Sequence, residues 1–282
     1  MATHLGECWM KSPIRKEIDV DINNIFYLVK TEQGFIRDKL EAFDRFVVGV
    51  NQISTDSNFK NTTSNINSER GHQSLSVVTN NTANKDNQIK KVRTLFAETV
   101  CPHSLEDIEQ NEPLLVTIRE ELGEKIALAL SPSTSQRFTN NLKTAILSSS
   151  KQSQYKLKAM NKGLDVEKKS LENLISLTDS FNKWLNSKNQ PIEEKGFTSL
   201  KNRHEKLSDF REKFEELTVQ RQSIIHSTTN SVFSANMSHD VLVNYLYQSL
   251  PVNYPVLSVS MQLINLCDNQ QRTVREYLTR CV

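Results

Sequence analysis

The sequence has little glycine, with only seven in 282 residues, and its seven prolines are scattered. Folds built entirely from β-strands need many tight turns, which depend on glycine, so this scarcity argues against them. Charged residues make up 24% of the chain and hydrophobic residues 37%. This composition suits long helices joined by short connections. We therefore expect an all-α fold.

The sequence also lacks a long apolar run. No stretch approaches the roughly 18 apolar residues of a membrane-spanning helix, and residues 1–16 contain no apolar segment of the kind found in signal peptides. The four cysteines, Cys8, Cys101, Cys267 and Cys281, lie far apart and form no CxxC pair. Neither a zinc site nor a disulfide framework is indicated. We expect a cytoplasmic protein that makes no contact with a membrane.

Catalytic and metal-binding motifs are missing as well. His204 and Glu205 begin an HExxH zinc motif, but Ser208 occupies the position of its second histidine. The Glu-x-x-His pair of a di-iron bundle occurs once, at Glu69 and His72, with no second copy. No glycine-rich phosphate loop is present. We therefore predict that the chain has no metal-binding residues.

Three further histidines, His103, His226 and His239, lie in contexts that do not favour catalysis. Cys101 and His103 flank a proline, where neighbouring side chains seldom align for proton transfer, so a nucleophile pair is not expected. His226 and His239 flank an aperiodic stretch and are expected to be surface or capping residues. We accordingly predict no catalytic residues, no cofactor-binding residues, no cofactor and no small-molecule substrate. The protein is not expected to be an enzyme.

Charge is balanced overall and uneven locally. The 35 basic and 33 acidic residues give a formal charge of +2, so no global field attracts nucleic acid. Residues 143–188, however, contain nine lysines against four acids. A solvated lysine face on a long helix is the simpler interpretation, and a surface that follows a phosphate backbone is the alternative.

The clearest positive pattern is a pair of long amphipathic helices, expected at about 134–188 and 198–227, separated by Pro191 and Gly196. Apolar residues recur at heptad spacing in both segments, as in a coiled-coil seam. The rows are Leu157, Leu164, Leu171 and Leu185; Ile146, Met160, Leu174 and Phe181; Leu200, Leu207 and Phe214; and Phe210, Leu217 and Ile224. Glu167, Arg203 and Arg221 interrupt them, and each buried cation must snorkel, find a carboxylate or select a register. The pair is predicted to form an antiparallel hairpin.

The remaining chain is expected to pack around this hairpin. Residues 1–53 are predicted to form a long N-terminal helix, and the Asn/Ser/Thr-rich segment 54–85 a disordered linker. Residues 86–282 then form the helical coiled-coil domain, with a helix reaching from Pro113 to Leu130 and C-terminal helices at about 238–250 and 255–281. The expected architecture is an elongated antiparallel bundle with short helices packed at one end.

The aromatic residues mostly follow the apolar periods. Phe181, Phe210 and Phe214 are predicted to lie in the core rather than to form a stacking surface for nucleic acid. The tyrosines that precede the last helix, Tyr245, Tyr247 and Tyr254, are expected either to close the end of the bundle or to form a contact patch.

Several short motifs follow one another along the chain. They are FAETV at 96–100, EPL at 112–114, ELG at 121–123, LKTAIL at 142–147, VEKKSL at 166–171, RQSIIH at 221–226, VNYLYQSL at 243–250 and YPVL at 254–257. In this order the sequence resembles an uncharacterised family of coiled-coil proteins, a domain of unknown function, found mainly in halophilic archaea. The resemblance implies a helical, coiled-coil protein and supplies no activity or site residue. The chain departs from that family in charge, because proteins of salt-accumulating cells are usually strongly acidic.

The sequence therefore leads to an interaction or scaffold protein that binds an unknown protein partner or itself. The alternative is a nucleic-acid-associated or regulatory accessory protein that uses the lysine-rich helix 143–188.

Overall fold

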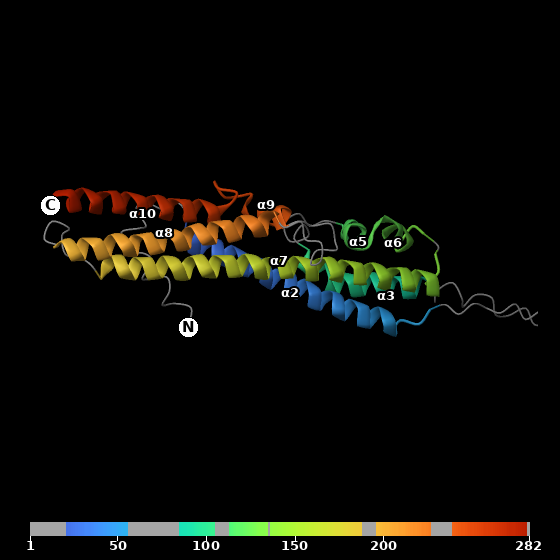
Figure 1. The fold of residues 1–282 in the computed structure, drawn as a ribbon. Helices are drawn as coiled ribbons and strands as arrows, with labels where there is room; N and C mark the ends of the chain where they lie inside the picture. Colours follow the sequence, from blue (N-terminus) through green and yellow to red (C-terminus); the bar gives the residue numbers. More distant parts are fainter. Residues whose placement is uncertain are drawn as a thin grey trace, which may run out of the picture. The chain divides into compact units, whose positions relative to one another are not determined.

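The computed structural model describes residues 21–55, 85–104, 113–134, 136–187, 196–226 and 239–280 (Figure 1). Within these ranges every regular element is a helix, so the prediction of an all-α fold is confirmed. None of the described helices combines the length and apolar content needed to cross a membrane. The predicted linker at 54–85 falls almost wholly outside the described residues, as do residues 1–20 of the predicted N-terminal helix.

The chain divides into two compact units, one of residues 35–158 and one of residues 1–34 with 159–282. The two long helices α2 (Ile22–Gln52) and α7 (Asn140–Asn186) each contribute to both units. This division differs from the sequence-based boundaries at 53 and 85, because each of these helices contributes one part of its length to each of two cores.

The unit of residues 35–158 is built around the second half of α2 and the first part of α7. Helix α3 (Lys85–Thr99), the short 3-10 turn η2 (Cys101–His103), α5 (Leu114–Leu122) and α6 (Glu124–Ala129) complete it. Phe46 and Phe96 meet edge to face in its core, with ring centroids 5.3 Å apart. Lys143 ties α7 to the end of α2 through the carbonyl oxygens of Asn51 and Ile53.

Two helix boundaries in this unit differ from the sequence-based ones. The predicted single helix from Pro113 to Leu130 is wrong, because Gly123 separates α5 from α6 with φ 96° and ψ 156°. Only glycine adopts that backbone conformation readily. Helix α7 begins at Asn140 rather than near 134, and the Thr139 hydroxyl caps it by accepting the Leu142 N–H at 3.2 Å.

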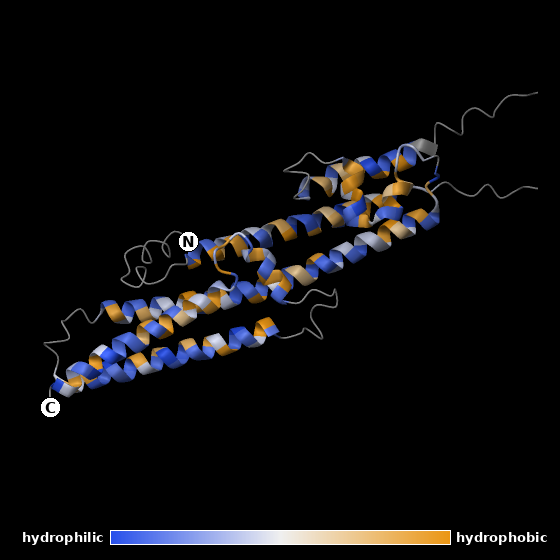
Figure 2. Cartoon of the chain, turned by 90° about the horizontal axis from the view of Figure 1, so that it is seen from above, coloured by the Kyte–Doolittle hydropathy of each residue, from blue (hydrophilic) through white to orange (hydrophobic). Residues whose placement is uncertain are grey.

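The other unit contains the second part of α7, α8 (Phe197–His226), α9 (His239–Tyr247) and α10 (Pro255–Arg280), with the start of α2. Helices α8 and α10 run antiparallel and pack along much of their length. Arg211 of α8 forms an ion pair with Asp268 of α10, with Nε 2.9 Å from Oδ1. Figure 2 shows hydrophobic and hydrophilic residues alternating along these helices, as amphipathic packing requires.

Most of the predicted seam residues of α7 and α8 in this unit are buried, whereas Met160, Leu185, Leu217 and Ile224 are half-buried. Leu164, Leu171, Leu174, Leu200 and Leu207 are all fully enclosed. The expectation that Phe181, Phe210 and Phe214 lie in the core is confirmed, because the Phe181 ring centroid lies 5.0 Å from that of Phe210 and 5.7 Å from that of Phe214. These contacts join α7 directly to α8.

Candidate functional site

A buried carboxylate, that of Glu167, marks the most unusual polar site in the described chain. Glu167 lies on α7 in the same heptad row as Met160, Leu174 and Phe181, and its exposed fraction is 0%. A carboxylate placed at such a core position loses its hydration, which is costly unless charged or hydrogen-bonding partners replace the water. The residues around Glu167 supply such partners.

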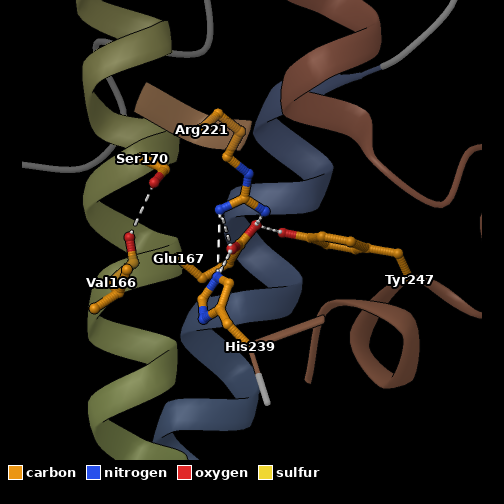
Figure 3. A network of polar contacts seen from close by, with 6 residues as sticks. All are labelled: Val166, Glu167, Ser170, Arg221, His239 and Tyr247. Atoms are coloured by element: carbon orange, nitrogen blue, oxygen red, sulfur yellow. Dashed lines mark hydrogen bonds and ion pairs between the residues drawn. The ribbon is translucent and has the colours of Figure 1, made fainter. Parts of the chain in front are cut away.

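The first partner is Arg221 of α8, which continues the heptad row of Leu200, Leu207 and Phe214. Its guanidinium contacts both carboxylate oxygens, with Nη1 2.6 Å from Oε2 and Nη2 2.8 Å from Oε1 (Figure 3). This two-point geometry is the strongest form of a carboxylate–arginine pair. The negative charge of Glu167 and the positive charge of Arg221 therefore neutralise each other.

The other two partners are the first and last residues of α9. His239 Nε2 lies 3.1 Å from Glu167 Oε2, and the Tyr247 hydroxyl donates to Oε1 at 2.6 Å. Because an ionised carboxylate can only accept, the His239 Nε2 must carry a proton. That nitrogen also lies 3.4 Å from Arg221 Nη1, a contact between two donors rather than a hydrogen bond. Both ends of α9 are therefore fastened to one carboxyl group.

The surroundings shift the pKa values of Glu167 and Tyr247. Burial alone would raise the pKa of Glu167, but the hydrogen bond from His239, the Arg221 charge and the Tyr247 and Arg221 hydrogen bonds outweigh it, so the pKa is lowered. Burial, followed by the negative charge and hydrogen bond of Glu167, raises the pKa of Tyr247 well above its ordinary value. Glu167 is thus held ionised and Tyr247 protonated at neutral pH.

We call Glu167, Arg221, His239 and Tyr247 the Glu167 network. Although it holds residue types that serve as acids and bases in enzymes, each member is at most 2% exposed and is engaged by another member. Of the Arg221 guanidinium nitrogens, Nε lacks a hydrogen-bond partner among the described residues. With both carboxylate oxygens occupied and water excluded, the network is suited to fixing the register of α7, α8 and α9.

Sequence reasoning identified only part of this network. The sequence predicts Glu167 and Arg221 as polar interruptions of the seams. Of the three alternatives for Arg221, which are to snorkel, to find a carboxylate or to select a register, the structure shows that it finds a carboxylate. The prediction that His239 is a surface or capping residue is wrong, because its exposed fraction is 2% and its ring faces Glu167. His226 is exposed, as expected. Tyr247 is fully buried against Glu167, whereas 39% of Tyr245 is exposed.

The incomplete histidine and cysteine motifs of the sequence take no part in the Glu167 network. His204 is half-buried on α8, with its Nε2 3.3 Å from Arg275 Nη1, and the described residues contain no group of three or more potential metal ligands. Cys101 and His103 both lie in η2. Glu69 and His72 fall outside the described residues.

Arg203 is the other cation on the α8 seam. Its guanidinium lies 5.4 Å from the ring centroid of Trp184, a cation–π contact.

Comparison with known proteins relates the chain to a family of proteins. No curated protein and no solved structure matches the chain. A family described as Domain of unknown function (DUF7260) matches residues 22–271, which include every member of the Glu167 network and all the described helices except the last residues of α10. Because that match covers most of the sequence, the chain belongs to the DUF7260 family of proteins.

Proposed function

We propose that this protein acts as a coiled-coil interaction protein, which binds a protein partner or a second copy of itself and catalyses no reaction. The observation that carries the proposal is the placement of Glu167 and Arg221, one on each seam, within direct contact of each other. Coiled coils use single polar or charged core positions to select one register and one set of neighbours. Such a device suits a protein whose helices must present a defined outer surface.

The enclosure of the Glu167 network supports the noncatalytic part of the proposal. A catalytic group must reach the proton or atom on which it acts, within hydrogen-bond distance or through one water. Glu167 and Tyr247 are 0% exposed, and their oxygen atoms already contact each other. The Tyr247 hydroxyl therefore uses its proton to bond the Glu167 carboxylate rather than a substrate, which favours a structural role.

Exposed apolar side chains on the outer faces support the binding part. Val219 of α8 is 65% exposed, Val241 of α9 52% and Met261 of α10 47%. Aliphatic and methionine side chains in such positions are suited to contacts with another polypeptide, because burying them removes apolar area from water. We propose that these three helices carry the partner-binding surface.

The cellular setting follows from composition and resemblance. Cys101 and Cys267 are free thiols, which fits the reducing cytoplasm that we propose for the protein. The resemblance to coiled-coil proteins of halophilic archaea extends the proposal to an archaeal host. The near balance of 35 basic and 33 acidic residues fits a host that does not fill its cytoplasm with salt.

Site-specific photo-crosslinking in the native host tests the proposal. A photoreactive amino acid is placed at Val219 or Met261 in the full chain, and at Leu128 of α6, which is 60% exposed, as a matched control in the other unit. We expect discrete protein adducts from the first two positions and fewer from Leu128. An adduct at twice 32.3 kDa identifies a second copy, and any other mass a different partner. Absence of protein adducts from both Val219 and Met261 would contradict the proposal.

A further inference from the structure

Four lysines on α7 share one face of the helix. Lys151, Lys158, Lys162 and Lys169 are separated by seven, four and seven residues, and all four are exposed. At about 100° per residue these positions lie within about 20° of a single line along the helix. All four project from one uninterrupted helix, so their alignment depends on α7 alone. We call them the lysine stripe.

Helix α7 has few acidic side chains near the lysine stripe. Glu167 faces the core, and Glu172 pairs with Lys168, whose Nζ lies 3.9 Å from its carboxylate. Asp165 is exposed on one side of the stripe and accepts a hydrogen bond from the uncharged Gln33 amide at 2.7 Å. The remaining exposed positions near the line are uncharged, among them Thr144, Asn173 and Ser176. Asp44 of α2 also lies along this side, where its Oδ1 accepts a hydrogen bond from the Gln154 amide at 2.7 Å. The four lysines outnumber the carboxylates of Asp44 and Asp165, so the lysine stripe carries a net positive charge.

An aromatic side chain lies within the stripe. Tyr155 is four residues after Lys151 and three before Lys158, which places it within about 40° of the same line. It is 49% exposed, unlike Phe181, Phe210 and Phe214, which fill the core. An exposed ring between cations is the arrangement with which proteins bind single-stranded nucleic acid, because the ring stacks on a base while the cations contact phosphates.

We propose that the lysine stripe with Tyr155 binds single-stranded nucleic acid through its phosphate backbone, a binding activity separate from the partner-binding surface inferred above. From Lys151 to Lys169 the stripe extends about 27 Å at 1.5 Å per residue. That length accommodates several nucleotides, within the range of about 4 to 16 bound by known single-strand modules. The contacts are to phosphate and to the faces of bases, so the binding has little sequence preference.

Fluorescence anisotropy of the full chain with a labelled, mixed-sequence DNA strand of about 20 nucleotides tests this inference. Each phosphate contact releases counterions, so four lysines give a slope of about −2.8 for log K against log salt between about 50 and 200 mM. The variant with K151Q, K158Q, K162Q and K169Q is expected to lose at least tenfold in affinity. Tyr155→Ala is expected to bind about tenfold more weakly with the slope unchanged, because base stacking contributes to affinity but involves no charge.

A matched variant with K30Q, K90Q, K125Q and K156Q removes the same charge from exposed positions off the stripe and should retain the affinity of the unaltered chain. Circular dichroism verifies that each variant has the helical content of the unaltered chain. Equal losses in both fourfold variants, or no binding by the unaltered chain at low salt, would overturn the inference. So would a duplex that binds more tightly than the single strand, or a polyglutamate chain that displaces the DNA as well as unlabelled DNA does.

Discussion

Arg221 and Glu167 lie 54 residues apart in sequence and form a two-point ion pair in which neither side chain is more than 1% exposed. Each occupies a position in its helix that the heptad pattern reserves for an apolar residue. The pair therefore replaces an apolar contact with a directional one, and His239 and Tyr247 use the same carboxylate to hold α9. Replacing any one partner should affect more than a single contact.

Tyr247→Phe tests the attachment of α9 to Glu167. It removes the hydroxyl that donates to Oε1 at 2.6 Å while leaving the ring in place. Hydrogen bonds to charged groups contribute about 1.5 to 3 kcal/mol, so we expect the free energy of unfolding to fall by that amount in urea denaturation. The control is Tyr245→Phe, which removes a 3.3 Å bond to Glu32 from a side chain that is 39% exposed. Equal effects from the two variants would contradict the importance of the network.

Acid should weaken the fold through Glu167. Its pKa in the folded protein lies below the ordinary value of 4.5, so the unfolded chain binds this proton at a higher pH than the folded protein does. The stability from Glu167 is therefore fully present above pH 4.5 and is lost as the pH falls through the lower, folded pKa. Urea denaturation from pH 7 downward should show that the stability difference between the unaltered chain and Glu167→Gln narrows below pH 4.5. A difference that stays constant or grows would show that Glu167 has no lowered pKa.

Gly123→Ala and Gly34→Ala should have opposite effects. Gly123 has φ 96°, so alanine there is strained and should cost on the order of 1 to 3 kcal/mol of stability. Gly34 lies inside α2 with no atom within 4 Å of an added Cβ, and alanine there should stabilise the helix by up to about 1 kcal/mol. Thermal unfolding followed by circular dichroism compares the two variants. A stabilising Gly123→Ala would mean that α5 and α6 form one continuous helix.

Phe214→Ala tests the contact between α7 and α8. Phe214 is fully buried against Phe181, and truncation of such a ring costs about 3 to 5 kcal/mol through lost burial and the cavity that remains. Val219→Ala on the same helix, at a side chain that is 65% exposed, should change stability by less than about 0.5 kcal/mol. Urea denaturation provides both values. A loss below about 1 kcal/mol for Phe214→Ala would place that ring outside the core.

Local sequence patterns predicted much of the fold. Whether a segment is helical, and which of its faces is buried, depends on residues only a few positions apart. The rows through Leu174 and Leu207 indicated the buried faces correctly. The break at Gly123 was missed because the leucine and isoleucine pattern continues across it. A single glycine inside such a pattern usually costs too little to end a helix, and here its positive φ is what ends α5.

The candidate site could be predicted only in part, because its members come from three helices. Helical spacing reveals that Glu167 and Arg221 interrupt apolar rows, but not which carboxylate meets which cation. His239 follows an aperiodic stretch, so nothing local indicates that α9 returns to contact α7. The available signal is the spacing of His239 and Tyr247 in the helix predicted at about 238–250, because residues eight positions apart lie on the same face of a helix.

The central structural claim is that Glu167 and Arg221 stabilise the fold as a pair, and a double-mutant cycle measures this directly. The chains compared are the unaltered protein, Glu167→Leu, Arg221→Leu and the double variant, each by urea denaturation at pH 7. Each single variant leaves a buried charge without its partner and should lose about 3 to 5 kcal/mol. The double variant leaves neither, so it should be less destabilised than the sum of the single variants by about 2 kcal/mol or more. If the two single losses add up to the loss of the double variant within about 0.5 kcal/mol, the two side chains act independently. That result would contradict the proposal that the pair fixes the register of the helices.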